Sequence, residues 1–215
     1  MTPIQAHIFD FDGILADTER LHWQAMQEVL APHNATFSWE TYERDYIGYD
    51  DRDALQHALK AANQACAPEL LQTLIRQKAA AFLHSVHHTH VPPFPGAIAA
   101  VKAAAAHGPV ALCTGALASD IAPLLTQFGI RELFQHIVTA EDVPASKPDP
   151  ASYVLACKGL GIPPTACLAI EDTPHGLQAA RGAGCQTLGV AQTHAPEALA
   201  PFADRVIPTL LDFIE

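Results

Sequence analysis

The stretch that decides the fold is "AHIFDFDGILADTERLH", residues 6–22. Its apolar run, which is typical of a buried strand, ends in two carboxylates, Asp10 and Asp12, and Asp12-Gly13 is a turn signal. Two like charges this close together need a cation or a shared proton. The stretch therefore predicts a strand followed either by a tight turn with solvated carboxylates or by a metal site where a reaction takes place.

Composition bounds the class of protein. The chain has 215 residues, of which 49% are hydrophobic and 16% charged, so it can form one large or two smaller domains with a sizeable core. Its formal net charge of -11 argues against a nucleic-acid partner, which requires a basic surface. A phosphorylated substrate is still allowed, because a bound divalent cation reverses the sign of the local charge.

Cysteine usage and the amino terminus indicate the compartment. The 5 cysteines are odd in number, widely spaced and without a CxxC pair, which disfavours a disulfide framework or a zinc site and favours a reducing compartment. The start "MTPIQAHIFDFDG" has no basic region typical of a signal peptide, and no apolar run is long enough to span a bilayer. We expect a soluble cytoplasmic protein with no membrane partner.

Residues 18 to about 88 carry a helical pattern. Thr18 is a candidate cap for a first helix, Pro32 stops that helix, and Pro68 suits the first position of a later one. The segment "VPPFPG", residues 91–96, contains three prolines and predicts a stiff connector. We therefore expect an all-helical segment that moves as a lid during the reaction.

Beyond the connector, the pattern alternates between helices and strands. Strands are predicted in "PVALCTG", "QHIVTA", "ACLAIEDT" and "QTLGVA", with helices between them, one of which contains Pro123. Such alternation predicts an α/β fold, a doubly wound parallel sheet with helices on both faces. The expected division is an α/β core of residues 1–16 and 93–215, with an inserted all-helical cap of residues 17–92.

Polar candidates follow four of the predicted strands. Ligands of an open parallel sheet bind at the carboxyl ends of its strands, so these residues should converge on one cleft. At a strand end, alternation should also point the side chains of Asp10 and Asp12 in different directions. The other candidates are Thr114, Gly115, Lys147, Glu171 and Asp172.

The residue types agree with phosphoryl transfer. A carboxylate can attack phosphorus, and a second acid can protonate the leaving alcohol and later activate water. Mg²⁺ prefers oxygen ligands, a lysine stabilises the transferring charge, and a hydroxyl with backbone N–H groups holds the phosphoryl oxygens.

In this order, "DFDGILADTE", "CTG", "SKPDP" and "IEDT" resemble the four motifs of the haloacid dehalogenase superfamily. The helical insert is similar to the cap of its phosphatase and β-phosphoglucomutase-like branch. The resemblance implies that Asp10 is the nucleophile and Asp12 the general acid and base. It also implies that Thr114 and the Gly115 backbone bind the phosphoryl group, and that Lys147 steadies the nucleophile.

The same resemblance implies a magnesium site. Mg²⁺ would bind the Asp10 carboxylate, the Asp12 carbonyl and Asp172, with Glu171 assisting. The implied partner is a small phosphorylated metabolite, and the expected assembly is a monomer or a weak homodimer.

Three functions compete within this class. The dehalogenases of the superfamily lack the second aspartate and need no metal, which Asp12 and the Glu171-Asp172 pair argue against, and a non-catalytic relative should lack a catalytic group. The mutases carry a lysine soon after the second motif, where this chain has "TGALASD". Hydrolysis of a phosphate monoester is therefore favoured, with a sugar phosphomutase as the alternative.

Several of these residues also have a simpler structural interpretation. Asp12-Gly13 and "KPDP" form turns in many proteins, and Glu171-Asp172 precedes a helix that Thr173 can cap. "YDDRD", residues 49–53, either reaches the cleft or only starts a helix. His22 either packs in a core or touches substrate, and the histidines of residues 84–90 are not favoured as a metal site.

Overall fold

The computed structural model describes residues 2–213, which fall into two compact units. The first unit comprises the residues up to Asp17 together with those from Pro92 onward, and the second is Thr18–Val91. The chain thus leaves the first unit after a single strand and returns to it through the proline-rich connector. Each unit has its own hydrophobic core and is described separately.

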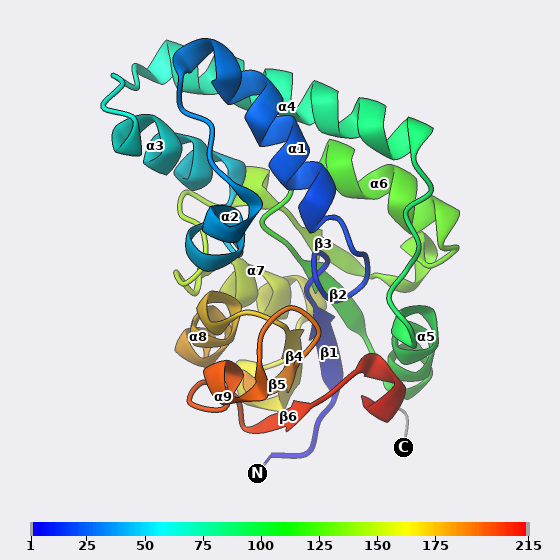
Figure 1. The fold of residues 1–215 in the computed structure, drawn as a ribbon. Coiled ribbons are helices and arrows are strands. Elements are labelled where there is room, and N and C mark those ends of the chain that lie inside the picture. Colours follow the sequence, from blue (N-terminus) through cyan, green and yellow to red (C-terminus); the bar gives the residue numbers. More distant parts are fainter. Residues whose placement is uncertain (1, 214–215) are drawn as a thin grey trace. The chain divides into compact units, whose positions relative to one another are not determined.

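The first unit is built on a six-stranded sheet in the order β3-β2-β1-β4-β5-β6, in which all neighbouring strands are parallel (Figure 1). The doubly wound parallel sheet expected from the sequence is confirmed. The sequence pattern did not predict β6, because it has only 3 residues and Pro208 follows it at once. The strands are β1 (Ala6–Phe9), β2 (Val110–Cys113), β3 (His136–Val138), β4 (Cys167–Glu171), β5 (Gln186–Val190) and β6 (Arg205–Ile207).

Helices cover both faces of this sheet (Figure 1). Helix α5 packs on β1 and β2 from one face, whereas α7 and α8 pack on the other. A parallel sheet covered in this way has strands that are apolar on both faces, and every residue of β2 is buried. The helices are α5 (Ala97–His107), α6 (Ala118–Gln127), α7 (Ala151–Leu160), α8 (Pro174–Ala183) and α9 (Pro196–Leu199), with short 3₁₀ turns at Arg131–Leu133, Ala140–Asp142, Pro164–Ala166 and Leu210–Phe213.

The second unit is all-helical, as the sequence predicted. Its helices are α1 (Glu19–Leu30), α2 (Trp39–Asp45), α3 (Asp51–Ala61) and α4 (Pro68–His88), with a 3₁₀ turn at Ala31–His33. Its core contains Leu30, Leu55, Leu59 and Leu74. The short helix α2 was not predicted. Within residues 2–213, no helix is long and apolar enough to cross a membrane.

Two helix N-caps were expected from the sequence, and the structure confirms one of them. Thr18 stands at the N-cap position of α1, but its side chain makes no capping hydrogen bond, so that expected role is wrong. Asp50 caps α3 by accepting a hydrogen bond from Asp53 N at 2.8 Å. Thr173 caps α8, accepting from Gly176 N at 3.0 Å, as predicted.

Candidate active site

The loop after β1 holds the two aspartates. The strand ends at Phe9, so Asp10 and Asp12 lie beyond it and not within its alternating part, contrary to expectation. Asp10 still pairs with the neighbouring strand, because its N–H donates to Ile170 O at 3.0 Å. Phe11 O then accepts the N–H of Leu15 at 2.8 Å, which closes a tight turn. The turn fixes both aspartates at the carboxyl end of the central strand.

Lys147 joins three strand ends at one point. Its Nζ donates to Asp10 Oδ1 at 2.9 Å, to Glu171 Oε1 at 2.6 Å and to Cys113 O at 3.1 Å. Only 7% of the lysine side chain is exposed, so both ion pairs are shielded from water. The lysine therefore fixes the position of Asp10 and supplies a positive charge beside it.

Glu171 ends β4 and is fully buried. Its Oε1 accepts hydrogen bonds from Lys147 and, at 3.0 Å, from Tyr153 Oη. Its Oε2 accepts from Asp172 N at 3.1 Å and from both the N–H and the hydroxyl of Thr173. Both oxygens are thus occupied, and Gly176 leaves the space for this carboxylate, since a Cβ there would collide with it. These contacts favour Glu171 as the residue that holds Lys147.

The electrostatics of Asp10 and Lys147 are opposed. Burial raises the pKa of Asp10 well above its ordinary value; Glu171 and Asp12 add to that rise, and Lys147 reduces it. Burial alone would lower the pKa of Lys147, but the carboxylates of Asp10 and Glu171 outweigh it and raise that pKa well above its ordinary value. Lys147 therefore stays positively charged in a site that has an excess of negative charge.

Thr114 follows β2 and faces Asp12. Its hydroxyl lies 3.4 Å from Asp12 Oδ2, to which it donates, and accepts the N–H of Ala116 at 3.0 Å. Thr114 N donates to Val138 O at 2.9 Å, so the backbone position is fixed by β3. Gly115 is the next residue in the same turn and is partly exposed. A hydroxyl and the backbone of a turn thus stand opposite the second aspartate.

Asp172 completes an all-oxygen cluster. Ligand oxygens of Asp10, Glu171 and Asp172 all lie within 4.8 Å of one another, and the three residues are buried. The Thr193 hydroxyl donates to Asp172 Oδ2. Gly13, at φ 75, passes so close that a Cβ would overlap the Asp172 carboxylate and the Thr193 methyl. The predicted site residues of four strand ends are therefore brought together.

Three supporting residues escaped the sequence analysis. Tyr153 lies in a predicted helix and was given no role, yet its hydroxyl donates to Glu171. Gln192 Nε2 donates to Gly13 O at 2.8 Å, and Thr193 holds Asp172. The usable signal was the position of "QTH", residues 192–194, after "LGVA", because β5 ends at the same edge as the other strands.

In the helical unit, His22 takes part in a buried polar group. Its Nδ1 lies 2.6 Å from Lys78 Nζ, its ring stacks on Phe82, and Lys78 pairs with Asp51 at 2.7 Å. "YDDRD" starts helix α3 through Asp50 and Asp51. Of the histidines in residues 84–90, His88 donates from Nδ1 to His84 O at 2.7 Å on the exposed end of α4.

A large cavity lies elsewhere in the α/β unit. It has a volume of about 680 Å³ and is lined by apolar and polar side chains, with Ile4, His7 and Leu168 among them. Those residues precede β1 or belong to the strands β1 and β4, whereas the acidic cluster follows the strand ends. The cavity and the candidate site are therefore distinct.

The family model for haloacid dehalogenase-like hydrolases matches residues 7–190 of this chain. The chain belongs to this family. Fructose-1-phosphate phosphatase YqaB of Escherichia coli (strain K12) is 31% identical over 183 residues, covering 85% of this chain and 94% of that protein. Hexitol phosphatase B of Escherichia coli (strain K12) is 31% identical over 198 residues, covering 91% and 86%.

Solved structures share the fold of this chain. CbbY from Rhodobacter sphaeroides in complex with phosphate has a TM-score of 0.84 and 29% identity, covering 99% of this chain and 96% of that one. The β-phosphoglucomutase of Clostridium difficile has a TM-score of 0.87 at 23% identity, covering 97% and 92%, and shows the shared fold. The chain matches relatives named as phosphatases over most of their length. This haloacid dehalogenase-like chain is therefore a phosphatase.

Proposed function

We propose that the chain hydrolyses the phosphate monoester of a small sugar or polyol through an aspartyl-phosphate on Asp10. The observation that carries the proposal is the contact of Lys147 with Asp10, in a buried cluster that also holds Asp172. Two relatives whose names state a fructose phosphate and a hexitol phosphatase activity support the substrate class.

In the first step, an Asp10 oxygen attacks phosphorus and the bond to the leaving alcohol breaks. Lys147 holds Asp10 Oδ1 at 2.9 Å, which leaves Oδ2 as the attacking atom. The lysine charge also stabilises the negative charge on the transferring group. The Thr114 hydroxyl and the backbone N–H of Gly115 would bind the equatorial phosphoryl oxygens.

Asp12 carries the protons. As a carboxylic acid it protonates the leaving alcohol, and as a carboxylate it then takes a proton from the water that attacks the aspartyl-phosphate. Two observations support this role: Asp12 is less buried than Asp10, and its Oδ2 lies 3.4 Å from the hydroxyl of Thr114, the proposed phosphoryl-binding residue. This division of work gives each of the two neighbouring aspartates its own role.

The donor set fits Mg²⁺, which members of this family generally use. The oxygens within 4.8 Å of one another and the space that Gly13 leaves beside Asp172 suit a small hard cation. Asp10, the Asp12 carbonyl and Asp172 would hold the ion, which when bound supplies positive charge for the phosphate. The predicted assistance of Glu171 stays a prediction, because its oxygens already accept bonds from Lys147, Tyr153 and Thr173. The predicted lid movement of the helical insert stays a prediction as well.

The experiment that tests the proposal compares phosphate release by the natural chain and by Asp10→Asn. The substrates are fructose 1-phosphate, a hexitol 6-phosphate and glycerol 3-phosphate, each with Mg²⁺ and with excess chelator. We expect Asp10→Asn and chelation to remove nearly all release, because an amide cannot form the aspartyl-phosphate. Asp45→Asn, at a half-buried aspartate of α2 that pairs with Arg44 outside the acidic cluster, is the matched control. Full release by Asp10→Asn would refute the proposal, and conversion of a hexose 1-phosphate to the 6-phosphate would favour the mutase alternative.

A second experiment isolates the role of Asp12. An alkyl alcohol leaves poorly unless it is protonated, whereas a nitrophenolate leaves without help. Asp12→Asn should therefore slow the first step with an alkyl phosphate by about 10²- to 10⁴-fold more than with the aryl phosphate. The aspartyl-phosphate should accumulate with the aryl substrate and be trapped in single-turnover measurements. Equal losses with both substrates and no trapped intermediate would assign Asp12 a structural role.

A further inference from the structure

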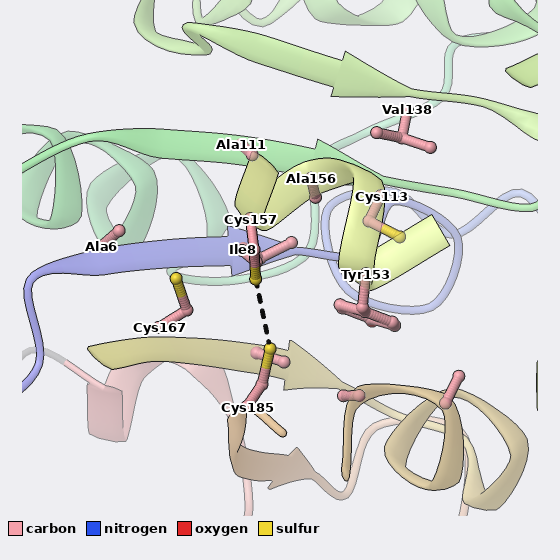
Figure 2. Close-up of a cluster of buried hydrophobic side chains, with 13 residues drawn as sticks. Ala6, Ile8, Ala111, Cys113, Val138, Tyr153, Ala156, Cys157, Cys167 and Cys185 are labelled. Atoms are coloured by element: carbon pink, nitrogen blue, oxygen red, sulfur yellow. Dashed lines mark hydrogen bonds between the residues drawn. The ribbon is translucent and has the colours of Figure 1, made fainter. Parts of the chain in front are cut away.

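Three of the five cysteines meet in the hydrophobic core of the α/β unit, although the sequence separates them widely. Cys157 lies on α7, Cys167 is the first residue of β4 and Cys185 directly precedes β5. The Sγ atoms of Cys157 and Cys185, 28 residues apart, lie 3.5 Å from each other. Figure 2 shows the two thiols pointing toward one another, with Cys167 beside them. We define these three residues as the thiol cluster.

The thiol cluster is separate from the candidate active site. Cys167 and Cys185 lie at the amino ends of β4 and β5, whereas the catalytic carboxylates follow the carboxyl ends of their strands. The other two cysteines are placed differently: Cys66 belongs to the helical unit, and burial raises the pKa of Cys113 to about 12. The phosphatase reaction thus has no use for these thiols.

Within the cluster, Cys157 has the environment of a nucleophile. Hydrogen bonds from the thiols of Cys167 and Cys185 lower the pKa of Cys157 and outweigh the opposing effect of burial. Thiolates, unlike thiols, attack peroxides. Cys185 is the most exposed of the three at 7%, against 2% for Cys157 and 0% for Cys167.

The geometry points to a modification site: we propose that hydrogen peroxide converts Cys157 and Cys185 into a reversible disulfide. Cys185 is favoured over Cys167 as the partner, because its Sγ lies 3.5 Å from that of Cys157, whereas Cys167 Sγ also contacts the carbonyl oxygens of Pro163 and Ile162, at 3.6 and 4.0 Å. A disulfide bond is about 2.05 Å long, so the sulfur atoms must approach by roughly 1.5 Å. Transient disulfides of this kind serve as redox sensors in reducing compartments.

The reaction balances in two steps. The Cys157 thiolate attacks one peroxide oxygen; an S–O bond forms, the O–O bond breaks, and hydroxide leaves and takes up the proton that Cys157 had lost. The Cys185 sulfur then attacks the sulfenic sulfur of Cys157; the S–S bond forms, the S–O bond breaks, and the Cys185 proton leaves with that hydroxide as water. Two thiols and one peroxide thus give one disulfide and two waters.

Peptide mapping of the full chain tests the proposal directly. Trypsin cuts after Arg131, Lys158, Arg181 and Arg205, and Pro148 protects Lys147, so the three thiols fall on three separate peptides. The reduced protein is treated with peroxide, blocked with N-ethylmaleimide, digested and analysed by mass spectrometry. We expect the Cys157 and Cys185 peptides joined, lighter than their sum by two hydrogens, and separated again by dithiothreitol.

The other outcomes overturn the proposal. They are a joined pair of the Cys157 and Cys167 peptides, irreversible sulfinic acid at Cys157, or full N-ethylmaleimide labelling after peroxide. Cys185→Ser should lose the joined pair while a sulfenic-acid probe labels Cys157, and Cys66→Ser is the matched control that should keep the pair. Thermal unfolding of each reduced variant verifies the fold, and the result on the natural chain stands even if a variant fails to fold.

Discussion

Each of the two units contains one buried lysine paired with acidic side chains, and the two lysines differ in what surrounds them. Lys147 contacts carboxylates from two strand ends, Asp10 at 2.9 Å and Glu171 at 2.6 Å. Lys78 of α4 contacts one carboxylate, Asp51 of α3, at 2.7 Å, and the imidazole of His22 of α1 at 2.6 Å. The first lysine lies among excess negative charge at the carboxyl ends of the strands, whereas the second is fully enclosed by helices.

This difference separates a charge held for a reaction from a charge that joins helices. Around Lys147, the pKa of Asp10 is raised, and the carboxylates of Glu171 and Asp172 lie close by. The acidic groups therefore outnumber the single positive charge of the lysine. Around Lys78, the ammonium group contacts one carboxylate and one imidazole and lies 5.1 Å from the centre of the Phe82 ring. We therefore expect substitution of Lys147 to cost mainly rate and substitution of Lys78 to cost mainly stability.

The largest effect is expected for Lys147→Met. The variant removes the charge that positions Asp10 and stabilises the transferring group, so kcat/KM for phosphate release should fall by about 10³-fold. Steady-state kinetics with the best substrate of the panel measures it. Lys158→Met, an exposed lysine of α7, is the control and should retain its rate. A rate within a few-fold of the natural chain would remove Lys147 from the reaction.

Lys78→Met should act on stability. Removing one member of a buried pair leaves the other charge uncompensated, so the free energy of unfolding should fall by about 3 kcal/mol, measured by urea titration. The double variant Lys78→Met/Asp51→Asn should recover part of the loss, since it removes both charges. Lys60→Met, at an exposed position of α3, should change little. If Lys78→Met were as stable as this control, the paired-charge interpretation would be wrong.

The same two lysines show what a sequence can predict. Lys147 was identified because it follows a predicted strand in "SKPDP", and parallel strands bring such positions to one edge. Lys78 was not singled out, because a lysine in an amphipathic helix is usually solvated, although it lies on the buried face with Leu74 and Phe82. Burial of a charge is decided by partners from other helices, here Asp51 and His22, which no local pattern contains.

In the remainder of the fold, too, local patterns were predicted and features that depend on distant residues were not. Strong strands and helices were predicted from periodicity, whereas β6 and α2 were missed because they are short and depend on neighbours. At the candidate site, the four strand-end groups were predicted, but Thr193 and Tyr153 were not, since a hydroxyl carries no motif of its own. The thiol cluster was likewise invisible in the sequence, because a contact over 28 residues requires the folded sheet.

Loss of the uncharged Thr193 hydroxyl, which donates to Asp172, should have a smaller effect than loss of either lysine. Thr193→Val keeps the side-chain volume but removes the hydroxyl that donates to Asp172. Because such supporting bonds orient a metal ligand, the affinity for Mg²⁺ should fall by about 10-fold, measured by calorimetric titration. Thr193→Ser, which keeps the hydroxyl, is the matched control and should bind Mg²⁺ nearly as well as the natural chain. Equal affinity in Thr193→Val and Thr193→Ser would show that this hydroxyl does not position Asp172.

The smallest effect is expected for His7, a half-buried ionisable residue that has, among the described residues, no charged partner like those of the two lysines. Within residues 2–213, Nδ1 of His7 has no hydrogen-bond partner, and burial together with the nearby His107 lowers the pKa of His7. Above the unfolded-state pKa of about 6.5, His7 is neutral in both states and the shift has no effect on stability. As the pH falls below that value, the unfolded chain takes up a proton that the folded chain resists, so stability is lost.

His7→Gln should therefore reduce the dependence of the unfolding free energy on pH between the unfolded pKa and the lower folded pKa. One full proton corresponds to about 1.4 kcal/mol per pH unit, and the partly exposed His7 should contribute only a fraction of that slope. Urea titrations at several pH values from neutrality downward measure it. His107→Gln removes only the repulsion from the second histidine, which is the weaker cause, and should reduce the slope less. An unchanged slope in His7→Gln would mean that His7 titrates alike in the folded and unfolded chain, and that burial without a partner has no measurable consequence at this position.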